Sequence, residues 1–172
     1  QTQGKVAFDA VSIIRMQAVH AETGGLQLGE GERVSGNTYT FAAPFAKLQT
    51  NFSRPLGAHH CTFNTNRWVF SAGDQVTYVH QLTGRRQMSG TVEVVVDPYI
   101  SGKLIVAADN GSSNWQNVAT VTAAGTQTLA LPAALFPADH ISIRMMAEPV
   151  DGSPDGASMQ VRGYGYRAEI DG

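Results

Sequence analysis

The chain has 172 residues, of which 42% are hydrophobic and only 15% are charged, and its formal net charge is -2. A charged fraction below the usual quarter, offset by Gly, Ser, Thr, Asn and Gln, is typical of a β protein with neutral polar solvent faces. This balance gives nucleic acid and anionic membranes no electrostatic attraction, and no apolar run approaches the roughly 18 residues of a spanning helix. Neither nucleic-acid binding nor membrane insertion is therefore expected. The single cysteine, Cys61, excludes an intramolecular disulfide.

Apolar residues alternate with polar ones along most of the chain, and amphipathic helices are nearly absent. Residues 8–21 are predicted to form a long strand, because Val11, Ile13 and Ile14 are β-branched. A short helix is the alternative for this segment. Each of the other strands predicted in the first half is bounded by Gly, Pro, Asn or Asp. These strands cover residues 37–44, 46–53, 67–71 and 74–82.

The second half shows clearer strands, beginning with residues 91–97, in which three valines alternate with Glu93 and Val95. The further strands are predicted at residues 102–109, 115–123, 126–132, 140–148 and 158–170. Residues 132–140 allow a single helical turn, and the Gly- and Pro-rich residues 150–157 indicate a surface loop. Gly163 and Gly165 predict a bulge or bend in the last strand.

About ten strands at a spacing of roughly 8 to 14 residues predict an all-β fold, an antiparallel β-sandwich of the jelly-roll type. We find no fixed-period repeat and no linker, so residues 1–172 are expected to form a single domain. The chain begins at Gln1 rather than Met, and we interpret it as a mature form or an excised domain.

The segment SGTVEVVVDPYISGKLIVAADNGSSNWQNVATV, residues 89–121, resembles a recurrent part of jelly-roll accessory modules in secreted bacterial proteins. In those modules a strand ends in an Asp-Asn/Gly turn, a tryptophan opens the next strand, and a Gly-Thr turn leads to Leu-Pro. Residues 140–148 and 161–170 are similar to their last two strands. The resemblance implies a non-catalytic carbohydrate-binding module that is secreted or displayed on the cell surface, often within or beside a larger protein. It implies no organic cofactor but frequently a structural calcium ion, for which the sequence offers no dense acidic loop.

Exposed aromatic rings are the first candidates for a sugar site, because flat rings stack on the C–H faces of pyranoses. Tyr99 follows a proline in a predicted loop, and Trp115 follows a polar turn. We favour the alternative that the tryptophans pack in the core or cap its end and that the ring of Tyr99 anchors its loop. The candidate ligand-binding residues are Trp68, Tyr99, Trp115, Asp109, Asn110 and Asn114.

Four arginines could add contacts to sugar hydroxyls or carboxylates, although Arg85-Arg86 is more simply a hairpin tip. These residues are Arg67, Arg85, Arg86 and Arg144. His59 and Cys61 would share one strand face, but a zinc site needs two more ligands. We therefore favour a structural role for both and assign no metal ligands.

Two other function classes remain open. The first is a structural, assembly or adhesion domain of a larger surface protein, which the weak charge and the lack of motifs favour. The second is a small glycoside hydrolase or lyase, with Glu93 as one half of a carboxylate pair. We favour an outward, solvated Glu93 with the neighbouring valines in the core, and we assign no catalytic residue.

Overall fold

The computed structural model describes residues 21–23, 25–46, 53–151 and 156–172. Fourteen strands and one short 3-10 helix occupy these ranges. No helix within them is long and apolar enough to cross a membrane. The strands predicted at residues 8–21 and 46–53 fall almost entirely outside the described residues.

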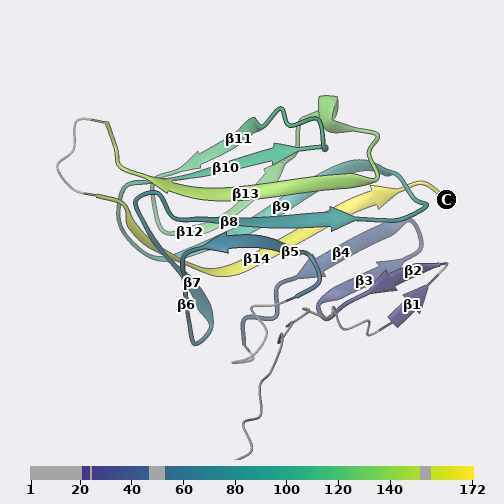
Figure 1. Ribbon diagram of the computed structural model, residues 1–172, viewed down its shortest axis with the longest axis horizontal. Coiled ribbons are helices and arrows are strands. Elements are labelled where there is room, and N and C mark those ends of the chain that lie inside the picture. The colour runs from purple at the N-terminus through teal and green to yellow at the C-terminus, as the bar shows by residue number, and fades with distance from the viewer. Residues whose placement is uncertain (1–20, 24, 47–52, 152–155) are drawn as a thin grey trace, which may run out of the picture.

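One sheet has five strands in the order β11-β10-β13-β8-β5, and all neighbours run antiparallel. Figure 1 shows its strands β10, β13 and β8 in front of β9 and β12 of the second sheet. The strands are β5 (Leu56–His60), β8 (Gln75–Gln81), β10 (Lys103–Asp109), β11 (Gln116–Val121) and β13 (His140–Glu148).

The second sheet has seven strands, with β12-β9-β14-β4-β3 as its main path and β7 and β6 added beside β14. Its strands are β3 (Glu32–Ser35), β4 (Thr38–Ala42), β6 (Thr62–Asn64), β7 (Arg67–Ser71), β9 (Gln87–Ser101), β12 (Gly125–Ala130) and β14 (Ser158–Ile170). The remaining elements are the hairpin of β1 (Ala21–Thr23) and β2 (Leu26–Leu28), and the 3-10 helix η1 (Ala133–Leu135). The predicted antiparallel sandwich is confirmed.

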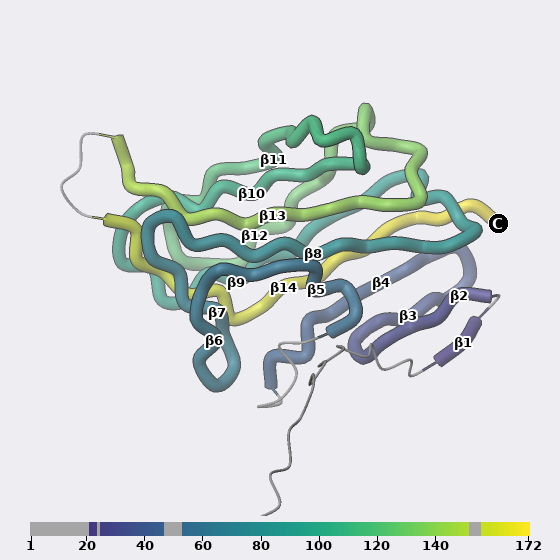
Figure 2. Tube along the Cα trace, viewed as in Figure 1, coloured from purple at the N-terminus to yellow at the C-terminus, as the bar shows by residue number. Residues whose placement is uncertain are grey.

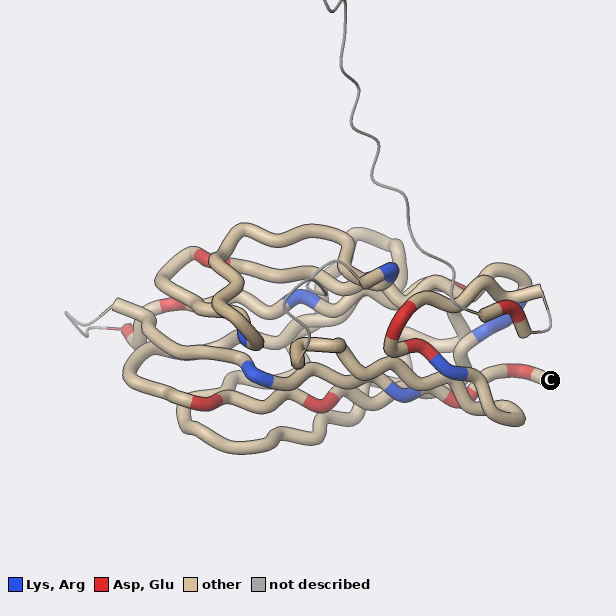
Figure 3. Tube along the Cα trace, turned by 90° about the horizontal axis from the view of Figure 1, so that it is seen from below, with Lys and Arg blue, Asp and Glu red and all other residues tan. Residues whose placement is uncertain are grey.

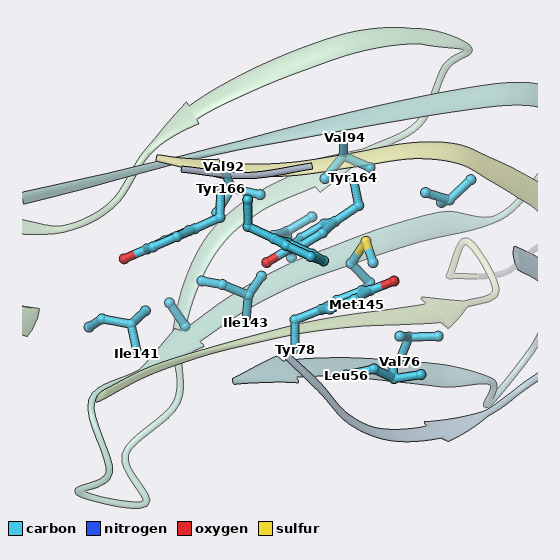
Figure 4. Close-up of a cluster of buried hydrophobic side chains, with 14 of the residues drawn as sticks. Leu56, Val76, Tyr78, Val92, Val94, Ile141, Ile143, Met145, Tyr164 and Tyr166 are labelled. Carbon is cyan, nitrogen blue, oxygen red and sulfur yellow. The ribbon is translucent and has the colours of Figure 1, made fainter. Parts of the chain in front are cut away.

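The core fills the space between the two sheets, as the alternation of apolar residues predicts. Val92, Val94 and Val96 of β9 are fully buried, and so are Ile143 and Met145 of β13. Figure 4 shows valines and tyrosines of one sheet pointing toward Tyr78, Ile143 and Met145 of the other. The inward valines and the outward, exposed Glu93 confirm the favoured arrangement of this strand.

Stacked rings connect the sheets at the centre of this core. Tyr78 of β8 lies parallel to Tyr164 of β14, with ring centroids 4.0 Å apart, and His80 lies parallel to Tyr166 at 3.9 Å. The Nε2 atom of His80 also lies 2.8 Å from the Tyr164 hydroxyl. Complete burial lowers the pKa of His80 well below its ordinary value, and the Arg54 charge lowers it further.

Several strands went unpredicted because they are short and rich in turn residues. Strands β3, β5 and β6 fall in stretches with Gly, Asn and Pro, which hide their alternation. Gly57 lies inside β5 at a shift in its pairing with β8. By contrast, β13 and β14 have the predicted bounds, and a shift between Val161 and Gly163 confirms the predicted bulge.

We expect His80→Phe to flatten the dependence of stability on pH. The folded protein keeps His80 neutral, whereas the unfolded chain takes up a proton there below a pKa of about 6.5. The free energy of unfolding of the native protein should therefore fall with pH below about 6.5, by up to about 1.4 kcal/mol per pH unit. Urea denaturation from about pH 7.5 to about pH 4.5 measures this slope.

The control for this experiment is His60→Gln at the exposed end of β5, which should retain the slope that His80 causes. His80→Phe also removes the partner of the Tyr164 hydroxyl, so it should lower stability at every pH. An unchanged pH slope in His80→Phe would show that the buried imidazole is not its source.

Candidate ligand-binding site

The turn between β10 and β11 is organised by one buried carboxylate. Asp109 is only 5% exposed. Its oxygens accept the backbone N–H of Gly111 at 2.9 Å, the N–H of Asn114 at 3.0 Å and the Ser112 hydroxyl at 3.1 Å. Gly111 has a φ of 89°, in the left-handed region that glycine adopts at low cost. The predicted hairpin turn is confirmed, and its carboxylate is committed to the turn itself.

These hydrogen bonds determine the acidity of Asp109. Burial alone would raise its pKa by penalising the charged form. The donors from Gly111, Ser112 and Asn114 outweigh burial and hold the pKa below its ordinary value. The carboxylate therefore stays ionised and rigid at neutral pH.

Trp115 leaves this turn and lies partly exposed on the outer side of the five-stranded sheet. The guanidinium carbon of Arg144 lies 4.3 Å from the centre of the indole ring, a cation–π contact. Arg144 is an outward residue of β13, paired with Ala107 of β10 on one side and Thr77 of β8 on the other. These short neighbours leave room for the long side chain to lie against the ring.

Arg144 has no carboxylate partner within the described part of the chain. Its Nε atom is buried without a hydrogen-bond partner there. The site thus combines an aromatic ring with an uncompensated, partly desolvated positive charge.

The two asparagines of the turn have different surroundings. Asn110 is half-buried, and its Nδ2 group donates to the backbone oxygen of Leu135 at 3.3 Å. Asn114 is exposed beside Trp115. Of the two, only Asn114 offers its side chain to a ligand next to the ring.

Trp68 lies in the core, so the alternative of core packing is confirmed for this tryptophan and its candidate role as a surface ring is wrong. Its exposed fraction is 0%, and its Nε1 group donates to the Tyr78 hydroxyl at 3.0 Å. The ring of Phe63 packs edge-on against the Trp68 ring, with the two ring centroids 4.9 Å apart. The sequence carried a signal for this burial, because Trp68 and Phe70 alternate with Arg67 in β7.

Tyr99 lies at the far end of the sandwich from Trp115. It belongs to the end of β9 rather than to a loop, and its hydroxyl donates to the Gly102 oxygen at 2.7 Å. It lies where β10 begins, whereas Trp115 lies just beyond the end of β10. A strand of this length separates the two rings by about 20 Å. The structure therefore does not combine Trp68, Tyr99 and Trp115 into one platform.

These four arginines are dispersed, and within the described ranges only Arg144 among them contacts an aromatic ring. Arg67 lies on β7 and donates to Asn66. Arg85 and Arg86 lie in a connection between the two sheets rather than at a hairpin tip, so that expectation is wrong. Figure 2 shows the C-terminus beside this connection, where Arg86 and Asp171 exchange hydrogen bonds.

Metal-ligating side chains do not gather within the described ranges. No group there contains three or more His, Cys, Asp or Glu residues that could hold an ion. The His59 ring lies 5.1 Å from Trp68, and burial raises the pKa of the half-buried Cys61 to about 12. The structural calcium ion therefore remains a prediction without a located site.

The fold and this patch define an antiparallel β-sandwich with an aromatic–cationic pair on one outer face. No family model and no curated protein matches the chain. Similar solved structures include a family 29 carbohydrate-binding module, with 13% identity, a TM-score of 0.45 and coverage of 74% of this chain and 91% of that one. A low-affinity xylan-binding module from Roseburia intestinalis has 16% identity, a TM-score of 0.43 and coverage of 79% and 97%.

Enzymes are also among the similar structures. A family two carbohydrate esterase from Cellvibrio japonicus has 13% identity, a TM-score of 0.40 and coverage of 77% of this chain. The match spans 33% of that esterase, and a similar match spans 16% of a family 115 glucuronidase. These likenesses concern the sandwich fold.

We expect Asp109→Asn to lower the free energy of unfolding by about 1–3 kcal/mol at neutral pH, because a neutral amide cannot accept all three donors of the turn. The folded pKa of Asp109 is lowered, so its stabilisation is present above the unfolded pKa of about 3.9 and is lost as pH falls through the folded pKa. Urea denaturation at about pH 7 and about pH 2.5 should show a large difference at the first pH and a small one at the second.

Asp151→Asn is the matched control, because the Asp151 side chain is 98% exposed and should contribute little. Equal stability of Asp109→Asn and the native protein at neutral pH would contradict the role of this carboxylate in holding the turn.

Proposed function

We propose that this protein is a non-catalytic carbohydrate-binding module and that Trp115 and Arg144 form its ligand contact. The observation that carries the proposal is the partly exposed indole with a guanidinium 4.3 Å from its centre. A ring at a fixed angle offers a flat apolar surface to the C–H face of a sugar. The guanidinium offers N–H donors to hydroxyls or a carboxylate at the edge of that sugar.

The rigidity of the turn supports this assignment. Because Asp109 holds Gly111, Ser112 and Asn114 in place, the indole has little conformational freedom to lose on binding. Preorganisation of this kind raises affinity without adding contacts. Asp109 then acts as a positioning residue, and Asn114 is the turn side chain beside the ligand.

The uncompensated charge of Arg144 favours an acidic sugar. A carboxylate can accept two parallel N–H groups from a guanidinium, and this geometry is stronger than a neutral hydrogen bond. The buried Nε atom makes no hydrogen bond among the described residues, so it does not commit the guanidinium to an acceptor of the protein. We therefore include uronic acids among the preferred ligands.

The surface around the site suits weak binding to a neutral or acidic polymer. Figure 3 shows that most of the described chain carries no charged residue, so there is little long-range steering. Glu93, the candidate for catalysis, lies on the opposite sheet from Trp115. The proposal places the module outside the cell, attached to or acting with a larger protein that meets polysaccharide there.

We expect Trp115→Ala to weaken retention on polysaccharide at least about ten-fold and to lower the free energy of unfolding only modestly, by about 1–2 kcal/mol, because the ring is only partly buried. Affinity electrophoresis in gels that contain neutral or uronate-bearing polysaccharides measures the retention. Trp68 supplies an internal control, because its buried indole N–H signal should stay unshifted in NMR titrations while that of Trp115 moves. Retention of Trp115→Ala that equals that of the native protein in every gel would refute this site.

A second variant, Arg144→Met, should separate charge from shape. Methionine keeps an apolar side chain beside the indole but removes the guanidinium. We expect roughly ten-fold to hundred-fold weaker binding of uronate-bearing oligosaccharides, equivalent to the loss of about 1.5–3 kcal/mol from charged hydrogen bonds. Neutral oligosaccharides should lose much less affinity in calorimetric titrations. An equal loss for both ligand classes would show that Arg144 acts only by supporting the ring.

A further inference from the structure

A shallow groove of about 350 Å³ crosses the outer face of the seven-stranded sheet. It runs over β4, β14, β9 and β12, on the side of the sandwich opposite to Trp115. An adjoining hollow of about 420 Å³ shares Thr40, Phe41 and Ala42 with it and continues along β3. Together the two hollows offer room for an extended ligand.

Gly165 forms the floor of this groove. It lies in β14 between Glu93 of β9 and Ala42 of β4. A Cβ atom at this position would meet only ordinary contacts, at 3.6 Å from the Phe41 oxygen and 3.7 Å from the Glu93 Cβ atom, and its backbone is not left-handed. Neither strain nor crowding therefore requires glycine here.

The neighbouring glycine shows the contrast. At Gly163 a Cβ atom would lie 2.8 Å from the Val95 Cγ2 atom, so close packing explains that glycine. A central strand normally gains stability from a β-branched residue and loses it with glycine. The bare floor at Gly165 therefore weakens the strand and keeps the groove open.

Complementary polar groups lie next to this floor, Glu93 across the sheet from Gly165 and Arg167 two residues further along β14. Glu93 is exposed and makes no hydrogen bond or ion pair among the described residues. Arg167, the next outward residue of β14, holds Glu169 at 2.9 Å and lies between Thr40 and Thr91 in the sheet. Thr128 pairs with Glu93 from the other side. The groove at Gly165 is thus lined by a carboxylate acceptor, a guanidinium donor and three threonine hydroxyls.

We propose that this groove is a second binding site and that it takes a neutral oligosaccharide chain. Sugar hydroxyls can donate to Glu93 and accept from Arg167, which no purely anionic or cationic ligand can do. The flat backbone at Gly165 leaves space for the C–H face of a sugar ring. A peptide strand is disfavoured, because peptides add to the free edge of a sheet and this groove lies on a face whose backbone groups are already paired.

The inference concerns a site separate from Trp115 and does not depend on it. If both sites bind, the module has two ligand contacts on opposite outer faces. Two weak contacts on one polymer network raise the overall avidity without new interactions, provided that the chains can reach both faces. The module would then hold adjacent chains rather than lie along one.

The test uses Gly165→Val in the full chain, with xylohexaose, cellohexaose and mannohexaose as neutral probes. Valine fills the floor of the groove and suits the strand, so the free energy of unfolding should stay the same or rise while affinity falls at least ten-fold. Thr126→Val is the matched control, because it adds the same side chain at an exposed position of β12 outside the groove lining. Glu93→Gln keeps the shape but removes the charge, and it should weaken binding several-fold.

Amide shifts in NMR titrations of the native protein locate the ligand independently of any variant. We expect shifts at residues 91–93 and 165–167 that persist in Trp115→Ala. The proposal fails if no neutral hexasaccharide shifts these signals at millimolar concentration, or if a folded Gly165→Val binds like the native protein. Should Gly165→Val not fold, the amide map and Glu93→Gln decide. If Trp115→Ala loses all binding while Gly165→Val binds like the native protein, the groove is ruled out and the Trp115 site stands. If Gly165→Val loses all binding while Trp115→Ala binds like the native protein, the Trp115 site is ruled out.

Discussion

Two pairs of stacked rings determine how the sheets of this sandwich face each other. Tyr78 lies against Tyr164 and His80 against Tyr166, each pair with centroids about 4 Å apart. Each ring comes from an inward position of β8 or β14, and successive residues of a strand point to opposite faces. Once these inward residues are fixed, the outward ones are fixed as well. Gly165 therefore opens the outer groove at a position set by the tyrosines on either side of it.

The polar atoms of these rings make the stack specific. His80 meets the Tyr164 hydroxyl on one side and, at 3.4 Å, the Tyr39 hydroxyl on the other. Tyr39 donates in turn to Glu32, which holds Arg54 in a part-buried ion pair. A buried polar network satisfies its groups in few arrangements, and a slipped strand would leave several without partners. We infer that this network stabilises the register more than it stabilises the core as a whole.

Local pattern alone predicts the long strands, but not the contacts between them. Apolar and polar residues alternate clearly along β13, so its bounds and its inward face follow from the sequence. The same rule applied to β7 places Trp68 inside, in agreement with the alternative that the tryptophans pack in the core. The contact between Arg144 and Trp115 depends on how β13 pairs with β10, which no local pattern encodes. For the same reason, the sequence could not show that Glu93 and Arg167 border one groove.

The two outer faces show different ways of giving up stability for an accessible surface. On one face Arg144 keeps a buried nitrogen without a partner, a cost that a smaller apolar side chain would avoid. On the other face Gly165 occupies a strand position that would accept a larger residue, as its neighbour Gly163 would not. Positions that are locally unfavourable without a packing reason are where function most often departs from stability. Among the described side chains, the one buried nitrogen or oxygen atom without a hydrogen-bond partner belongs to Arg144 on the outer face, and none lies in the core. The stacked rings in the core thus supply the rigidity that lets one outer face keep the unpaired Arg144 nitrogen and the other keep a glycine at position 165.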